Sequence, residues 1–156
     1  MLEVKNISYS YPEKPGLKNI SFELKKGNII AVLSIGFIAN NVIEAIEFIS
    51  NKEKIAHYDM RFAKPIDEEM LHEVFTNYNK IVTVEDGTVV GGFGSAVLEF
   101  MNAHGYKADV KIVGIPDRLV EHGTPKQLYE EIGIDANGIA ETLREMSKIS
   151  VAELVK

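Results

Sequence analysis

Apolar runs and amphipathic segments alternate along the chain from residue 29 onward. Four short runs that predict strands are Ile29–Leu33, Lys54–Met60, Lys80–Asp86 and Asp109–Ile115. The first of them, IIAVL, is apolar throughout, as expected of a strand covered on both faces. Strands separated by single helices imply right-handed crossovers, so we expect an α/β fold: a three-layer α/β/α sandwich around a mostly parallel sheet of about five strands.

Helical spacing appears between these runs. Apolar residues recur every three or four positions over about 40–50, which predicts a helix. Asp67 is expected to cap a second helix, in which Glu68 and Glu69 favour the positive end of the dipole. The apolar residues expected to face inward on the second helix and on a third, opened by Gly94 and Ser95, are Met70, Leu71, Val74, Phe75, Val97, Leu98 and Met101.

The C-terminal part also has helix signals. Thr124, Pro125 and Gln127 make a capping-box start with proline at the first helical position, and Gly133 ends that helix. Asp135 is the expected cap of a last helix that buries Ile139, Leu143 and Met146.

Residues 1–28 follow a different pattern. Apolar and polar residues alternate through a first strand with a bulge expected near Asn6, a turn over Pro12–Gly16, and a second strand that ends at KKGN. We therefore expect two parts: an antiparallel β meander over 1–28 and an α/β domain over 29–156.

Composition and charge narrow the range of possible functions. A chain of 156 residues fits one domain of ordinary size, and the absence of cysteine removes disulfides and thiolate chemistry, which suits a reducing cytoplasm. The formal net charge of −6 disfavours binding to nucleic acid. No apolar run approaches the length of a membrane span, and the N-terminus does not have the pattern of a signal peptide, so neither a membrane nor an export role is expected.

A glycine cluster follows the third predicted strand. GFGSAV at 92–97 fits the GxGxxA form of a dinucleotide fingerprint, but five residues separate it from the strand and no acidic residue ends the next strand. A tight turn into a helix explains these glycines more simply. A small-ligand or nucleotide-binding module that uses the strand ends at Ser34–Ile38 and Gly91–Ser95 stays open as a rival function.

Other candidate chemistry is sparse. The four histidines form no HxH or HxxxH pair, and neither Ser34 nor Ser95 lies in a GxSxG setting, so no metal site and no catalytic triad are predicted. Asp59 and Arg61 close a strand at the edge where α/β sheets present functional groups, and alternation places both side chains on one face, where they could form an ion pair.

Three separated blocks of sequence carry a family resemblance. They are AHYDMRFAKPIDEEMLHEVF at 56–75, IVTVEDGTVVGGFGSAVLEFM at 81–101 and VGIPDRLVEHGT at 113–124. In this order they resemble the C-terminal domain of transketolase-like, thiamine-diphosphate-dependent enzymes, above all 1-deoxy-D-xylulose 5-phosphate synthases. The resemblance covers residues 29–143, about three quarters of the chain.

The resemblance implies a role in contacts. In that family other domains hold thiamine diphosphate and magnesium, so this chain alone is expected to bind no cofactor and to be inactive. Glu85-Asp86-Gly87 lacks the downstream asparagine of the thiamine-diphosphate motif, and an Asp-Gly turn after the strand explains it. The resemblance implies a homodimer and contacts with the missing catalytic domains, with these candidate interface residues: Asp59, Arg61, Lys64, Gly92, Phe93, Gly94, Asp117 and His122.

The first 33 residues separately resemble the opening strands of an ABC-transporter ATPase. The phosphate loop of such an enzyme is missing, because SIGFIANN follows Leu33 in place of GxxxxGK[ST]. In the synthase family a YPRG stretch contributes an arginine to substrate phosphate, whereas YPEK places Glu13 there. Two family patterns joined near Ile30 suggest a recombined, engineered or truncated product, so a chimeric fold without activity is a third hypothesis beside the contact domain and the ligand-binding module.

Overall fold

The computed structural model describes residues 2–11, 14–24, 30–50 and 52–147, with the backbone alone described over 2–11 and 14–24 and at residue 53. The main sheet has the strand order β4-β3-β5-β6, and all three of its strand pairs are parallel. Its strands are β3 (Ile30–Ile35), β4 (Ile55–Asp59), β5 (Lys80–Thr88) and β6 (Asp109–Ile115). The predicted α/β class and the mainly parallel sheet are confirmed.

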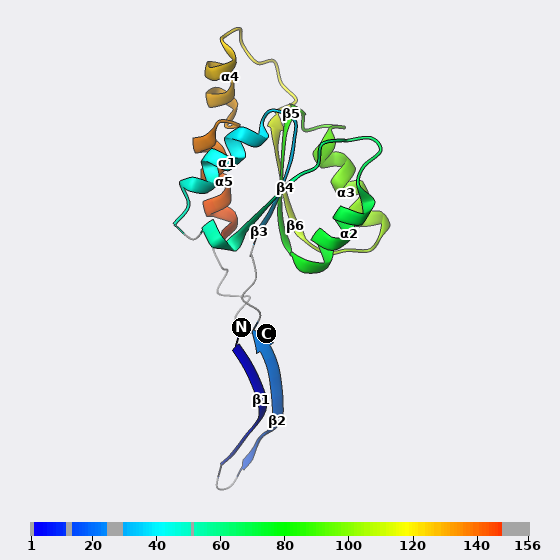
Figure 1. Ribbon diagram of the computed structural model, residues 1–156, viewed down its shortest axis with the longest axis vertical. Helices are drawn as coiled ribbons and strands as arrows, with labels where there is room; N and C mark the ends of the chain where they lie inside the picture. The colour runs from blue at the N-terminus through cyan, green and yellow to red at the C-terminus, as the bar shows by residue number, and fades with distance from the viewer. Residues whose placement is uncertain (1, 12–13, 25–29, 51, 148–156) are drawn as a thin grey trace.

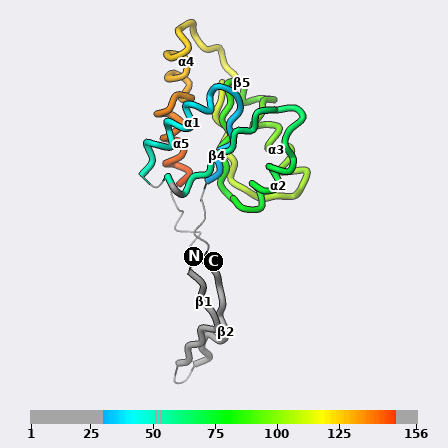
Figure 2. Tube along the Cα trace, viewed as in Figure 1, coloured from blue at the N-terminus to red at the C-terminus, as the bar shows by residue number. Residues whose placement is uncertain are grey.

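Helices cover both faces of this sheet, as Figure 1 shows. One face carries α1 (Ala39–Glu47) and α5 (Ala136–Ser147), with α4 (Pro125–Ile132) beyond them, and the opposite face carries α2 (Glu68–Asn77) and α3 (Phe93–Ala103). A short 3₁₀ turn, Lys52–Lys54, precedes β4. In Figure 2 the end of the described chain in α5 lies beside α1, so elements far apart in sequence share one layer.

Two apolar cores separate the three layers. Ile30, Val32, Val82 and Val84 point to the α1 and α5 side, while Ala31, Leu33 and Ile81 point to the α2 and α3 side. The alternation along β3 and β5 explains why residues 30–33 include no polar residue, since both faces of each strand are buried.

The predicted helix boundaries are confirmed where capping residues set them. The Asp67 carboxylate accepts from the Met70 N–H at 2.9 Å, and Thr124 and Gln127 form the reciprocal capping box at the start of α4. Gly133 ends α4 in the left-handed conformation, with φ of 74°. Asp135 accepts from the Gly138 N–H at 3.0 Å at the start of α5.

The main sheet has four strands in the described residues, whereas the sequence predicts about five. The N-terminal segment does not supply a fifth, because β1 (Leu2–Tyr11) and β2 (Lys14–Leu24) pair with each other as a separate antiparallel sheet. It is a two-stranded hairpin and not a meander. The bulge expected near Asn6 is confirmed by a register shift between Val4 and Ile7.

The prediction that Asp86-Gly87 forms a turn after the strand is wrong. β5 continues through Thr88, and its pairing with β6 shifts register between Val84 and Thr88. The two residues therefore belong to an irregular strand end that carries the chain toward α3.

Candidate interface at the carboxyl edge of the sheet

The loops that follow the four parallel strands lie at one edge of the sheet, because parallel strands end on the same side. Each loop carries one large apolar side chain that is mostly exposed: Phe37 (77%), Phe62 (66%), Val90 (61%) and Leu119 (92%). We call these four residues the apolar rim. Among the described residues, the other large apolar side chains with high exposure are Ile43 and Phe48 of the α1 segment. Exposed apolar side chains gathered at one edge are typical of a contact surface.

The loop after β4 adds charge beside Phe62. The Arg61 backbone N–H donates to the Asp59 carboxylate at 3.2 Å, and the Arg61 guanidinium lies 3.9 Å from the same carboxylate. The predicted ion pair is present, but both side chains are exposed, so it contributes about 0 to 1 kcal/mol. Lys64 is exposed further along the loop, next to a cis bond to Pro65.

A polar pair lies beneath the ends of β3 and β4. The hydroxyl of Ser34, which is fully buried, lies 2.7 Å from Nε2 of His57. Burial lowers the pKa of His57, and the nearby Asp59 carboxylate opposes that shift. Ser34 is inaccessible, so the pair links the two strands and does not form a nucleophilic centre.

A buried carboxylate lies at the end of β5. Glu85 is 4% exposed, and its two oxygens accept from the backbone N–H groups of Phe93 at 2.8 Å and Gly94 at 2.9 Å. These amides open α3, where the helix dipole is positive, so the carboxylate caps the helix from a neighbouring strand. The sequence does not indicate this contact.

The loop between β6 and α4 carries Asp117 and His122, both exposed. Arg118 donates to Glu131 of α4 at 3.4 Å. The Tyr129 hydroxyl of α4 donates to Asp86 at the end of β5, and this hydrogen bond raises the pKa of Tyr129 to about 12. These contacts hold α4 near the carboxyl edge.

Five of the eight predicted interface residues are exposed at this edge, Asp59 as the last residue of β4 and the others in loops: Arg61, Lys64, Asp117 and His122. Gly92 is half-buried, while Phe93 (3% exposed) and Gly94 are buried within the fold and present no surface for a partner. They shape the α3 turn from inside. Sequence reasoning missed the apolar rim, although an apolar residue in a loop after each predicted strand was a usable signal.

The residues at the glycine turn do not fit a magnesium diphosphate group. Both oxygens of Glu85 accept backbone N–H groups, and Asp86 accepts the Tyr129 hydroxyl. Magnesium takes free carboxylate oxygens in near-octahedral geometry. Within the described ranges, no group of three or more His, Asp or Glu side chains could hold a metal ion.

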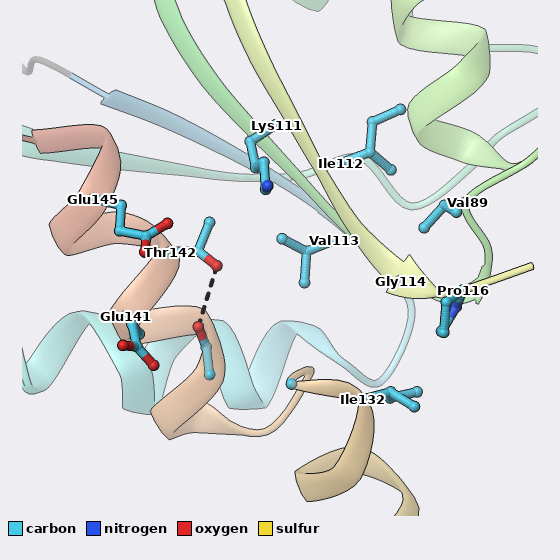
Figure 3. Close-up of a pocket in the computed structure, with 12 residues that line it drawn as sticks. Val89, Lys111, Ile112, Val113, Gly114, Pro116, Ile132, Glu141, Thr142 and Glu145 are labelled. Carbon is cyan, nitrogen blue, oxygen red and sulfur yellow. Dashed lines mark hydrogen bonds between the residues drawn. The ribbon is translucent and has the colours of Figure 1, made fainter. Parts of the chain in front are cut away.

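A separate open hollow of about 460 Å³ lies between β6 and α5, shown in Figure 3. Lys111 of β6 faces it from one side and Glu141 and Glu145 of α5 from the other, and the Thr142 hydroxyl donates to the Gly138 carbonyl at 3.2 Å. None of the eight predicted interface residues lines this hollow.

In the described part of the chain, no helix combines the length and apolar character needed to span a bilayer.

Comparisons with known proteins agree with the geometry. A family profile described as "Transketolase, C-terminal domain" matches residues 22–139. A 1-deoxy-D-xylulose-5-phosphate synthase of Cytophaga hutchinsonii is 54% identical over 128 residues, which are 81% of this chain and 20% of that protein. One from Azobacteroides pseudotrichonymphae is 45% identical over 92% of this chain and 22% of its own length.

A solved structure titled "Split gene transketolase, inactive beta4 tetramer" superimposes with a TM-score of 0.69 at 29% identity. The match covers 78% of this chain and 40% of that one. The chain thus spans about a fifth of the length of the curated relatives it matches. The matched profile, the synthase relatives and the shared fold show that the chain belongs to the transketolase C-terminal domain family.

Proposed function

We propose that the chain is the non-catalytic C-terminal domain of a 1-deoxy-D-xylulose 5-phosphate synthase-like transferase, where it supports dimerisation and shapes the cleft between domains. The observation that carries this proposal is the high identity to such synthases, 54% and 53% for two of them, confined to about a fifth of their length. In this proposal the domain contributes contacts, while the chemistry belongs to the rest of the enzyme.

The apolar rim is the proposed contact surface, and its proposed occupant is the remainder of a synthase, in the same or in a second subunit. The four apolar side chains on this edge are exposed in this chain alone and would be buried only against a partner. The other four fifths of the relatives' length would supply that partner. Asp59, Arg61, Lys64, Asp117 and His122 would form the polar border that interfaces commonly have.

Cofactor and cellular setting follow from the same proposal. Thiamine diphosphate and magnesium would be held by the other domains, the parent activity would serve isoprenoid biosynthesis, and the site of action would be the cytoplasm. The relative titled as a tetramer supports self-association, and we propose a dimer for this chain.

Reconstitution tests the proposal. The Cytophaga synthase lacking the region similar to this chain would be expressed with this chain supplied separately. We expect the two to copurify and synthase activity to return. The paired substitutions Phe62→Ser and Leu119→Ser, in the apolar rim, should reduce copurification and activity at least tenfold, which corresponds to a loss of about 1.4 kcal/mol of binding energy.

The matched control is Ile43→Ser, which removes an exposed apolar side chain of α1 outside the rim. It should leave copurification unchanged. No association at all, or equal losses for the rim and control variants, would contradict the proposed surface.

We keep a separate origin of residues 1–28 as a proposal. The pairing of β1 with β2 in their own sheet supports it, while the 92% coverage by the Azobacteroides relative means that part of this segment also aligns with a synthase. A chain of residues 29–156 should then unfold at the midpoint of the full chain. A marked drop in the midpoint would show that the segment is integral to the domain.

A further inference from the structure

The Glu85 side chain lies where a bound anion lies in glycine-rich nucleotide sites. Those sites place a phosphate against the backbone N–H groups at the start of a helix that follows a strand. Here the first amides of α3, Phe93 and Gly94, donate to the two oxygens of one carboxylate at 2.8 and 2.9 Å. The geometry of anion binding is present, and the anion belongs to the chain itself.

Three glycines approach this carboxylate closely, and a side chain on Gly92 or Gly114 would force neighbouring atoms to shift. A Cβ on Gly92 would stand 2.2 Å from a carboxylate oxygen of Glu85, and a Cβ on Gly87 would stand 3.0 Å from the same oxygen. On the neighbouring strand, a Cβ on Gly114 would lie 2.9 Å from Cγ of Glu85. None of the three glycines has a positive φ, so close approach to Glu85 and the local backbone explains them better than backbone conformation does.

We propose that the turn Gly91–Gly94 and the start of α3 together form a carboxylate-binding site, and that the side chain of Glu85 is its permanent ligand. This site accounts for the likeness of GFGSAV to a dinucleotide fingerprint, and its resident carboxylate occupies the amides that a phosphate would need. The inference concerns the chain's own fold and does not depend on the proposed function.

The same site fixes the loop that presents Val90. Gly91 N–H donates to the Ser95 hydroxyl at 3.0 Å, and that hydroxyl donates to the Val89 carbonyl at 3.0 Å. Val89 N–H in turn donates to the Ile115 carbonyl at 3.0 Å. Because Glu85 also accepts from the N–H groups of Phe93 and Gly94, the loop is hydrogen-bonded on both sides of Val90, which is held outward.

Anion rescue is the test. Glu85→Ala removes the resident carboxylate and leaves the two amides without it. Added acetate or formate, exchanged for chloride at constant ionic strength, should raise the thermal midpoint of this variant by a few degrees in a saturable way, because a ligand bound only by the native state stabilises it. The wild-type chain should show no comparable rise, since its site is filled.

The matched control is Asp86→Ala, which removes the adjacent carboxylate that accepts from Tyr129 and lies outside the site. Acetate should not rescue it. An equal rise for wild type, Glu85→Ala and Asp86→Ala would be a general salt effect and would overturn the proposal, as would the absence of any rise for Glu85→Ala.

A second measurement covers the case in which Glu85→Ala does not fold. Inorganic diphosphate titrated into the wild-type chain should leave the amide resonances of Phe93 and Gly94 unchanged, and Glu85→Gln should speed hydrogen exchange at these two amides more than at Ala96. Diphosphate-dependent shifts at Phe93 and Gly94 in the wild type, or unchanged exchange in Glu85→Gln, would refute the assignment.

Discussion

Two neighbouring strand-to-helix turns each contain a glycine with positive φ, but they differ in how the start of the helix is capped. The turn from β3 to α1 contains Gly36 with φ of 82°, and the turn from β5 to α3 contains Gly91 with φ of 74°. Neither helix has a side-chain cap from its own N-cap residue, Ile38 or Gly92. Only the second helix receives a carboxylate from the preceding strand. A glycine turn therefore does not define an anion site unless the strand end supplies or admits the anion.

The strand ends differ because their polar residues face opposite layers. Ser34 lies on the α1 side and meets the ring of His57, whereas Glu85 lies on the α3 side and meets backbone amides. One buried group is neutral and needs a single partner. The other is charged, and burial of a charge is tolerated only with several hydrogen bonds.

The largest expected effect is the difference in unfolding free energy between removing the Glu85 side chain and removing the Ser34 hydroxyl. Glu85→Ala should lower the free energy of unfolding by about 3 to 5 kcal/mol, because two hydrogen bonds to a charged group are lost and two amides are left without their acceptor. Ser34→Ala should cost about 1 kcal/mol, since one neutral hydrogen bond is lost. Chemical denaturation of both variants measures the difference, and equal losses would mean that the Glu85 contacts add nothing special.

Alanine substitutions in the two turns should differ next. A Cβ on Gly92 would meet the Thr88 carbonyl oxygen at 2.1 Å, so Gly92→Ala must displace backbone and should cost about 3 kcal/mol or more. Gly36→Ala meets nothing within 4 Å and carries only the strain of its positive φ, about 1 to 2 kcal/mol. Comparison of their denaturation midpoints checks the order, and a costlier Gly36→Ala would reverse our account of the two turns.

Lowering the pH should reduce the stability of the fold through His57 of β4, whose ring contacts Ser34 of β3. The pKa of His57 is lowered in the folded chain by burial, against the weaker opposing effect of Asp59, so the unfolded chain binds more protons once the pH falls below the ordinary value of about 6.5. Stability from this group is therefore present above about pH 6.5 and is lost as the pH falls below it. His57→Gln should flatten that part of the pH profile of the thermal midpoint, and an unchanged slope would count against the burial effect.

Ligand addition should have the smallest effect. The thermal midpoint should stay the same with magnesium plus thiamine diphosphate or magnesium plus ATP at millimolar concentration, because the carboxylates near the glycine turn are already bonded. A rise of several degrees with either would revive the ligand-binding rival and point to the Gly91–Gly94 turn or the Ser34–Ile38 turn.

The elements of the fold could largely be predicted from sequence, since each depends on local rules. The IIAVL run, the Asp67 cap, the Thr124 capping box and the Gly133 stop all act within a few residues of chain. The strand count could not be predicted in this way, because whether β2 joins the main sheet or pairs with β1 is a choice between distant partners.

The candidate site was only half predictable. Asp59, Arg61 and Lys64 follow a strand visibly, and the structure exposes them at the carboxyl edge. Phe93 and Gly94 belong to the same sequence signature as Gly92, yet they are buried, because the turn into α3 packs them against the sheet and Glu85.

By itself the sequence determined the α/β alternation, the helix caps and the family pattern, because periodicity and capping are properties of neighbouring residues. Tertiary structure alone decided that Glu85 is buried while Asp86 beside it is exposed, and that Phe37, Phe62, Val90 and Leu119 share one edge. Both outcomes depend on which helix start and which strand ends meet in space, and residues far apart along the chain settle that when the layers pack.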